Sequence, residues 1–70
     1  MTKEELKKLL INKIKENKGQ TPRELNINGN IYLWSGGQKI GNSYLYRYRN
    51  EKIDINDEKQ IMLPLRMEAF

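Results

Sequence analysis

The sequence contains neither cysteine nor histidine among its 70 residues. The absence of cysteine excludes a disulfide framework and a thiolate metal site. The absence of histidine removes the most common general base and the most common transition-metal ligand. The carboxylates, amines and hydroxyls that are left would need a cleft, which a domain of this size rarely encloses. We therefore expect no enzyme activity, no metal site and no cofactor.

Long apolar runs are also missing. The longest, Leu9 to Ile11 and Ile61 to Leu65, are far shorter than the roughly 20 residues that span a bilayer. The first residues lead directly into a lysine-rich helical pattern, without the apolar core of a signal peptide. We expect one cytoplasmic domain over residues 1–70, because this length suits a single small core.

Acidic residues are absent from Leu25 to Asn50, although the whole chain has nine of them against thirteen Lys and Arg, a net charge of +4. The same stretch contains the tryptophan and all four tyrosines. Basic side chains among aromatic ones suit nucleic acids, through phosphate neutralisation and base stacking. They are equally typical of a sheet whose tyrosines form the core and whose arginines face solvent.

Residues 3–18 predict an amphipathic helix. Thr2 is a good N-cap, and Glu5 three positions later completes a capping box. One apolar stripe, at four-residue spacing, is formed by Leu6, Leu10 and Ile14. This helix needs an apolar surface against which the stripe can be buried.

Two β-hairpins are predicted, over about 25–34 and 44–55. In the first, Asn28-Gly29 favours a two-residue turn that places Leu25 opposite Tyr32. The second has its turn at Asn50-Glu51. Its expected pairs are Tyr48 with Ile53, Tyr46 with Ile55 and Arg47 with Asp54. A glycine-rich loop is expected over 35–43, and an extended segment, confined to an edge by Pro64, over 60–67.

Alternation divides the strand residues between two faces. The apolar and aromatic set is Leu25, Ile27, Tyr32, Trp34, Tyr44, Tyr46, Tyr48, Ile53 and Ile55. We expect this set to face the helix stripe and form the core. The predicted fold is α+β, with an N-terminal amphipathic helix packed on one face of a small antiparallel sheet of three to five strands.

The opposite face carries aliphatic residues beside cations: Ile31, Leu33, Leu45, Arg47, Arg49 and Lys52. Three explanations stay open. The segment from Ile61 to Met67 folds over this face, basic residues on it meet phosphates or a DNA groove, or the aliphatic residues form the centre of a protein interface.

The first functional hypothesis is a small non-enzymatic nucleic-acid-binding protein, most simply DNA-binding, from a mobile element or phage. Its expected phosphate contacts are Arg47, Arg49, Lys52 and Lys39, with Asn42 or Asn50 at base edges. The alternative is a protein-binding inhibitor or adaptor, such as a phage anti-defence protein of the anti-CRISPR kind. It would dock on a host protein or nucleoprotein complex through Ile31, Leu33, Leu45 and Arg47. A homodimer joined through edge strands is compatible with either hypothesis.

Two short stretches resemble known DNA-binding families. Residues 14–25, Ile-Lys-Glu-Asn-Lys-Gly-Gln-Thr-Pro-Arg-Glu-Leu, resemble the opening helices of winged helix-turn-helix regulators, although a strand pattern follows where a recognition helix belongs. Residues 31–33, 41–49 and 52–55 are similar to the three-stranded arm-type DNA-binding domains of tyrosine recombinases, in which the helix follows the sheet. Both resemblances imply DNA binding.

Overall fold

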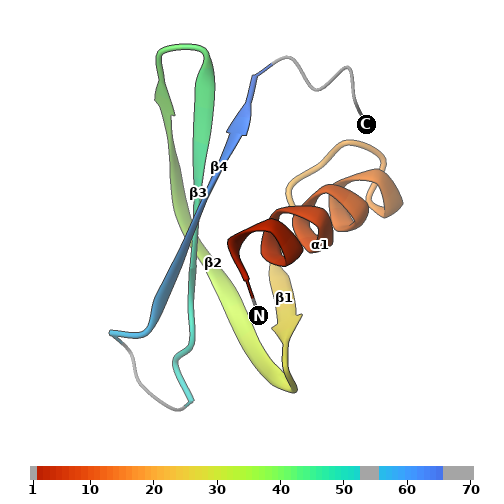
Figure 1. The fold of residues 1–70 in the computed structure, drawn as a ribbon. Coiled ribbons are helices and arrows are strands. Elements are labelled where there is room, and N and C mark those ends of the chain that lie inside the picture. Colours follow the sequence, from red (N-terminus) through yellow and green to blue (C-terminus); the bar gives the residue numbers. More distant parts are fainter. Residues whose placement is uncertain (1, 53–55, 66–70) are drawn as a thin grey trace.

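The computed structural model describes residues 2–52 and 56–65 (Figure 1). In this part of the chain one helix precedes four strands. They are α1 (Lys3–Glu16), β1 (Glu24–Ile27), β2 (Asn30–Ile40), β3 (Ser43–Arg49) and β4 (Glu58–Pro64). The strands form one antiparallel sheet in the order β1-β2-β3-β4. The α+β class predicted from the sequence is confirmed.

The ends of α1 follow from local chemistry. The Thr2 hydroxyl accepts a hydrogen bond from the Glu5 backbone N–H at 3.2 Å, as the capping box predicts. The helix ends at Glu16, two residues earlier than expected, because Lys18 takes a positive φ of 57°. Gly19 N–H then donates to the Ile14 carbonyl at 2.8 Å in a Schellman arrangement. No second helix follows over 17–23, so the helix-turn-helix resemblance does not extend to the fold.

The first hairpin has the predicted register, with Leu25 opposite Tyr32. Its turn has positive φ at Asn28 and Gly29, 53° and 86°, as a type I′ turn requires. The expected glycine-rich loop over 35–43 was wrong, since β2 continues to Ile40 before turning. A bulge between Trp34 and Gly36 absorbs one residue, and the ladder to β3 resumes beyond it.

The expected pairing of β3 with residues 52–55 was also wrong. The strand pairs with β4 instead, with Tyr46 opposite Ile61 and Tyr44 opposite Leu63. The predicted partners of the tyrosines and of Arg47, residues 53–55, lie outside the described part of the chain. Both candidate segments have apolar residues at every second position, so the alternation alone could not choose between them. Because β4 lies beside β3 in the sheet, its residues 61–64 do not fold over the opposite face.

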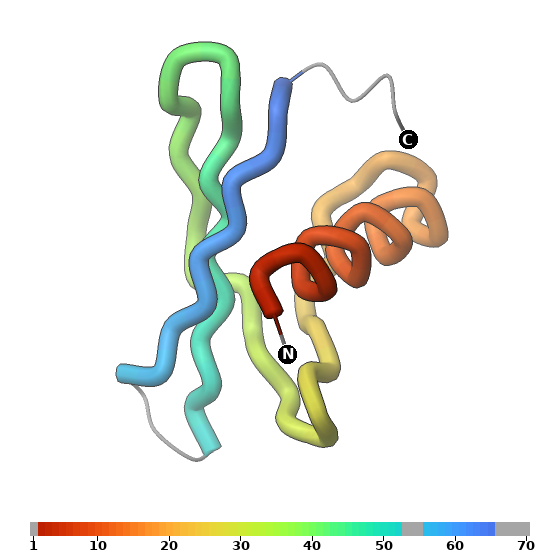
Figure 2. The backbone as a smooth tube through the Cα atoms, in the orientation of Figure 1, coloured from red at the N-terminus to blue at the C-terminus, as the bar shows by residue number. Residues whose placement is uncertain are grey.

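The core joins the helix stripe to inward-facing residues of all four strands. It contains Leu6, Leu10, Ile14, Leu25, Ile27, Tyr32, Tyr46, Tyr48, Ile61 and Leu63. Tyr44 packs at its margin, but Trp34, which was expected inside, is 43% exposed. Trp34 lies next to the bulge, where β1 stops covering β2. Figure 2 shows the β2–β3 turn, in green, standing away from α1.

Two buried tyrosines at the other end of the sheet bind partners through their hydroxyls. The Tyr48 hydroxyl donates to the Pro22 carbonyl at 2.9 Å, and the Tyr32 hydroxyl donates to Asp57 Oδ2 at 2.6 Å. Burial raises the pKa of Tyr48, and the hydrogen bond to Asp57 raises the pKa of Tyr32. These bonds satisfy polar groups that would otherwise be costly to bury.

Candidate functional site

The side of the sheet opposite the core is called the open face below. By register and alternation it carries Glu24, Ile31, Leu33, Gln38, Ile40, Leu45, Arg47, Arg49, Glu58, Gln60 and Met62. The predicted docking residues Ile31, Leu33, Leu45 and Arg47 are all among them. Two of the expected phosphate contacts, Arg47 and Arg49, share the face, because they alternate with buried tyrosines along β3.

One carboxylate binds both arginines of the open face. Arg49 Nη2 lies 3.2 Å from Glu58 Oε2, and Arg47 Nε lies 3.9 Å from Glu58 Oε1. Gln60 Nε2 donates to the same Glu58 Oε1 at 3.0 Å, and Arg47 Nη2 donates to Gln38 Oε1 at 3.4 Å. The hydrogen bonds from Gln60 and Arg49 hold the pKa of Glu58 below its usual range. The guanidinium groups are thus oriented by neighbours on adjacent strands.

Apolar side chains flank this charged cluster. Leu33 is 40% exposed and Met62 38%, and Ile31 is half-buried. Leu45 is buried and lies opposite Gln38 on one side and Met62 on the other. A hollow of about 490 Å³ lies at the Leu33 end of the face, lined by Glu24, Ile31, Leu33, Glu51 and Lys52. Lys52 therefore lies near the aliphatic residues, as the sequence predicted.

The formal charges of the open face cancel. Arg47 and Arg49 are matched by Glu58 and Glu24, and at the rim Lys52 is matched by Glu51. The lysine excess lies on α1, at Lys3, Lys7, Lys8, Lys13 and Lys15. Lys3 and Lys7 line a hollow with Gln60 and Met62, so they lie at the β4 rim of the open face and not among the arginines. The sequence could not show this cancellation, because Glu58 reaches the arginines only through the β3–β4 register.

The other expected nucleic-acid contacts are not brought together. Lys39 and Asn42 are exposed near the β2–β3 turn, at the opposite end of β3 from Arg49. Asn50 was wrongly expected at a base edge, since it is only 1% exposed. Its Oδ1 accepts a hydrogen bond from the Lys52 backbone N–H at 3.0 Å, and its side chain lies within hydrogen-bonding reach of the Tyr32 hydroxyl. Asn50 is therefore part of the interior.

Sequence reasoning missed three residues of this region. Met62 and Glu58 join the open face through the β4 register, and Trp34 is exposed because of the bulge. The run of acidic residues before a predicted strand was the only available signal for Glu58. The local signal for the bulge was Gly36, which has a positive φ of 136°, because glycine inside a strand is typical of a bulge.

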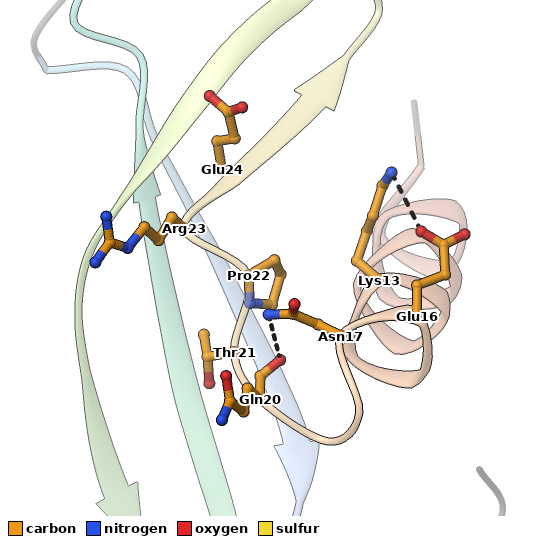
Figure 3. Close-up of a pocket in the computed structure, with 8 residues that line it drawn as sticks. All are labelled: Lys13, Glu16, Asn17, Gln20, Thr21, Pro22, Arg23 and Glu24. Atoms are coloured by element: carbon orange, nitrogen blue, oxygen red, sulfur yellow. Dashed lines mark hydrogen bonds and ion pairs between the residues drawn. The ribbon is translucent and has the colours of Figure 1, made fainter.

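A second hollow, of about 570 Å³, lies between the end of α1 and the connection to β1 (Figure 3). Its polar side chains bind one another: Lys13 Nζ lies 3.5 Å from Glu16 Oε2, and Asn17 Nδ2 donates to the Gln20 carbonyl at 3.4 Å. None of the polar residues that line it is buried, and we assign it no role.

Comparisons of the chain with protein-family models, with curated proteins and with solved structures find no match. Within residues 2–52 and 56–65, no helix has the length and apolarity needed to cross a membrane. No cluster of acidic side chains in that part is arranged to hold a metal ion. The function is therefore argued from the geometry of the open face.

Proposed function

We propose that the protein is a non-enzymatic binding protein whose open face docks on a protein partner. Exposed Leu33 and Met62 supply apolar contact area, and Arg47 and Arg49 supply anchors already held in place by Glu58. Arginine and methionine are enriched at protein interfaces, whereas lysine is depleted. The apolar stripe of α1 belongs to the core on the other face of the sheet, so the open face is available to the partner.

The observation that carries the proposal is the charge cancellation on the open face. Affinity for nucleic acid depends on cations that replace the counterions of phosphates. The two guanidinium groups of the open face already share a carboxylate, and phosphates would have to compete with it. A protein interface gains from a mixed centre of this kind, because arginine is enriched among the residues that contribute most to binding and the surrounding apolar contacts exclude water from it.

Within this proposal, the protein acts inside a cell as an inhibitor or adaptor of a host protein or nucleoprotein complex. Such a role needs a stable surface and no catalytic group. The face fits it, since each charged group at its centre has a partner on an adjacent strand.

The nucleic-acid hypothesis stays a second candidate, on one observation. Trp34 is 43% exposed on a hairpin without acidic residues, where Lys39 and Asn42 are also exposed. An exposed indole can stack on a base, and Lys39 farther along the same hairpin can neutralise a phosphate. In this second candidate, nucleic acid contacts the β2–β3 hairpin and not the cluster of Arg47 and Arg49.

A photo-crosslinking amino acid at position 33 tests the proposed function in cells that contain the partner. We expect one defined protein adduct that nuclease treatment does not change. The matched control is the same amino acid at Asn12, which is exposed on α1 and should give no such adduct. An adduct at position 33 that nuclease removes would contradict the proposal.

Oligonucleotide binding at low salt tests the second candidate. If phosphates were bound by the open face, Arg47→Ala and Arg49→Ala would each reduce the slope of log affinity against log salt by about one. The proposed function predicts no such change, while hairpin binding predicts loss of affinity in Trp34→Ala alone.

A further inference from the structure

The strand β2 is much longer than its neighbour β1. The two strands pair over Asn30 to Leu33, and a last hydrogen bond joins Trp34 N–H to the Arg23 carbonyl at 2.8 Å. Beyond it, in the part of the chain that the structure describes, residues 35–40 pair with β3 alone. We call the unpaired side of 35–40 the distal edge. An edge with free backbone groups is a template for another strand.

The register identifies the free groups. Ile40 and Ser43 flank a two-residue turn, and the pair that closes such a turn is hydrogen-bonded. Hydrogen-bonded and non-hydrogen-bonded pairs alternate along an antiparallel ladder. Gln38 is therefore bonded to β3, whereas Gly37 and Lys39 occupy non-hydrogen-bonded positions. Their N–H and C=O groups point away from β3, along the distal edge.

The surroundings of the distal edge leave room for a strand. Gly36 and Gly37 carry no side chain, and the Tyr44 ring lies across the Gly37 position. Trp34, at the start of the edge, is 43% exposed. An apolar side chain of an added strand would contact Trp34 and the edge of the Tyr44 ring.

The charges beside the distal edge are basic. Arg23 lies at one end and Lys39 at the other, and neither is in the ion pairs that the described residues form. Figure 3 shows the Arg23 side chain pointing away from α1, on the side of β2. The nearest acidic residue in the sequence is Glu24, next to Arg23. Lys39 lies five positions after Trp34, about 16 Å along an extended chain.

We propose that the distal edge binds an extended acidic segment of the protein partner as an added antiparallel strand. This inference rests on the proposed function in that the partner is a protein. The segment has acidic residues near Arg23 and Lys39 and an apolar residue between them, beside Trp34. A second copy of the chain fits less well, because its own Arg23 and Lys39 would lie beside the same two cations of the first copy. Backbone bonds supply affinity, and the flanking charges supply selectivity.

Amide hydrogen exchange followed by NMR tests the inference on the intact chain. The probe is the acetylated, amidated heptapeptide Glu-Thr-Val-Thr-Val-Thr-Glu at millimolar concentration, in which both glutamates and both valines share one face of an extended strand. At about tenfold excess over its Kd, we expect exchange at Gly37 and Lys39 to slow by about tenfold. The Gln38 amide, already bonded to β3, should be protected with and without peptide. Binding without slowing at Gly37 and Lys39 would overturn the inference.

Two control peptides separate backbone pairing from charge. Methylation of alternate backbone nitrogens should abolish the slowing, because it removes the donors that pair with the edge. Replacing both glutamates by lysine should weaken binding about tenfold or more, since Arg23 and Lys39 then face like charges. Equal binding of all three peptides would contradict strand addition.

Two variants separate this inference from the proposed function. Lys39→Pro removes an edge N–H without removing a bond to β3, and should abolish peptide protection at Gly37, whereas Lys39→Gln should retain part of it. Met62→Asp, on the exposed part of β4, should leave peptide protection unchanged while abolishing the crosslink formed from position 33 on the open face. A variant that loses the crosslink in cells but keeps peptide protection has lost binding at the open face alone. A variant that keeps the crosslink but loses peptide protection has lost binding at the distal edge alone.

Discussion

The two ends of the β2–β3 hairpin contain the same kinds of residue in opposite surroundings. At the end beside β1, Tyr32 and Tyr48 are buried and their hydroxyls bind Asp57 and the Pro22 carbonyl. Trp34 lies opposite Tyr48, at the point where β1 ends, and is 43% exposed, and Ile40 beside the turn is 44% exposed. The first end is covered by β1 and by the core residues of α1, and the second has lost β1.

Alternation along a strand thus decides on which face of the sheet a side chain lies, but it does not decide whether that side chain is buried. A second layer must lie over that face before an aromatic residue becomes core. Where the layer ends, the same residue type becomes available for binding. The covered end contributes to the core, whereas side chains of the distal end and of the open face stay exposed.

The sharpest test of this difference is a pair of aliphatic truncations. Leu10 is fully buried, so Leu10→Ala should lower the free energy of unfolding by about 2–5 kcal/mol. Ile40→Ala, at the exposed end, should change it by less than about 0.5 kcal/mol. Urea unfolding followed by circular dichroism measures both. Equal losses would show that the distal end is packed like the core.

A smaller effect is expected from the tyrosine hydroxyls. Tyr48→Phe leaves the buried Pro22 carbonyl without its donor and should cost about 1–3 kcal/mol. Tyr44→Phe, at the core margin, is the matched control and should cost less than about 0.5 kcal/mol. If both variants unfold at the same urea concentration as the parent, the buried hydrogen bond contributes nothing to stability.

Gly37 tests packing at the distal end itself. A Cβ at this position would collide with the Tyr44 ring, so Gly37→Ala should cost about 1–2 kcal/mol. In a Tyr44→Leu background the same substitution should cost less, because the obstructing ring is gone. A double-mutant cycle in urea measures the coupling. Additive effects would mean that the ring does not lie over Gly37.

The smallest expected effect is a pH dependence at the covered end. The Tyr32 hydroxyl, followed by Lys59, lowers the pKa of Asp57 below its ordinary value of 3.8. A carboxyl with a lowered folded-state pKa stabilises the protein above the unfolded pKa, and this stabilisation is lost as pH falls through the folded value. Asp57→Asn should therefore flatten the acid limb of unfolding below pH 4. An unchanged acid limb would contradict the Tyr32–Asp57 bond.

Much of the fold follows from short-range rules. The Thr2 cap, the Asn28-Gly29 turn and the burial of Tyr46 and Tyr48 were all predicted, because caps, tight turns and alternation depend on residues close in sequence. The four residues proposed for docking were likewise placed on one face by alternation along β2 and β3.

Tertiary structure alone decided which segment pairs with β3, which brought Glu58 to both arginines. It also decided that Trp34 is exposed and that Asn50 is buried. The physical reason is that segments with the same alternation compete for one strand, and lengthening the connecting loop changes the closure entropy only slowly. The choice is then made by the side chains that meet across the sheet, and these are far apart in the sequence.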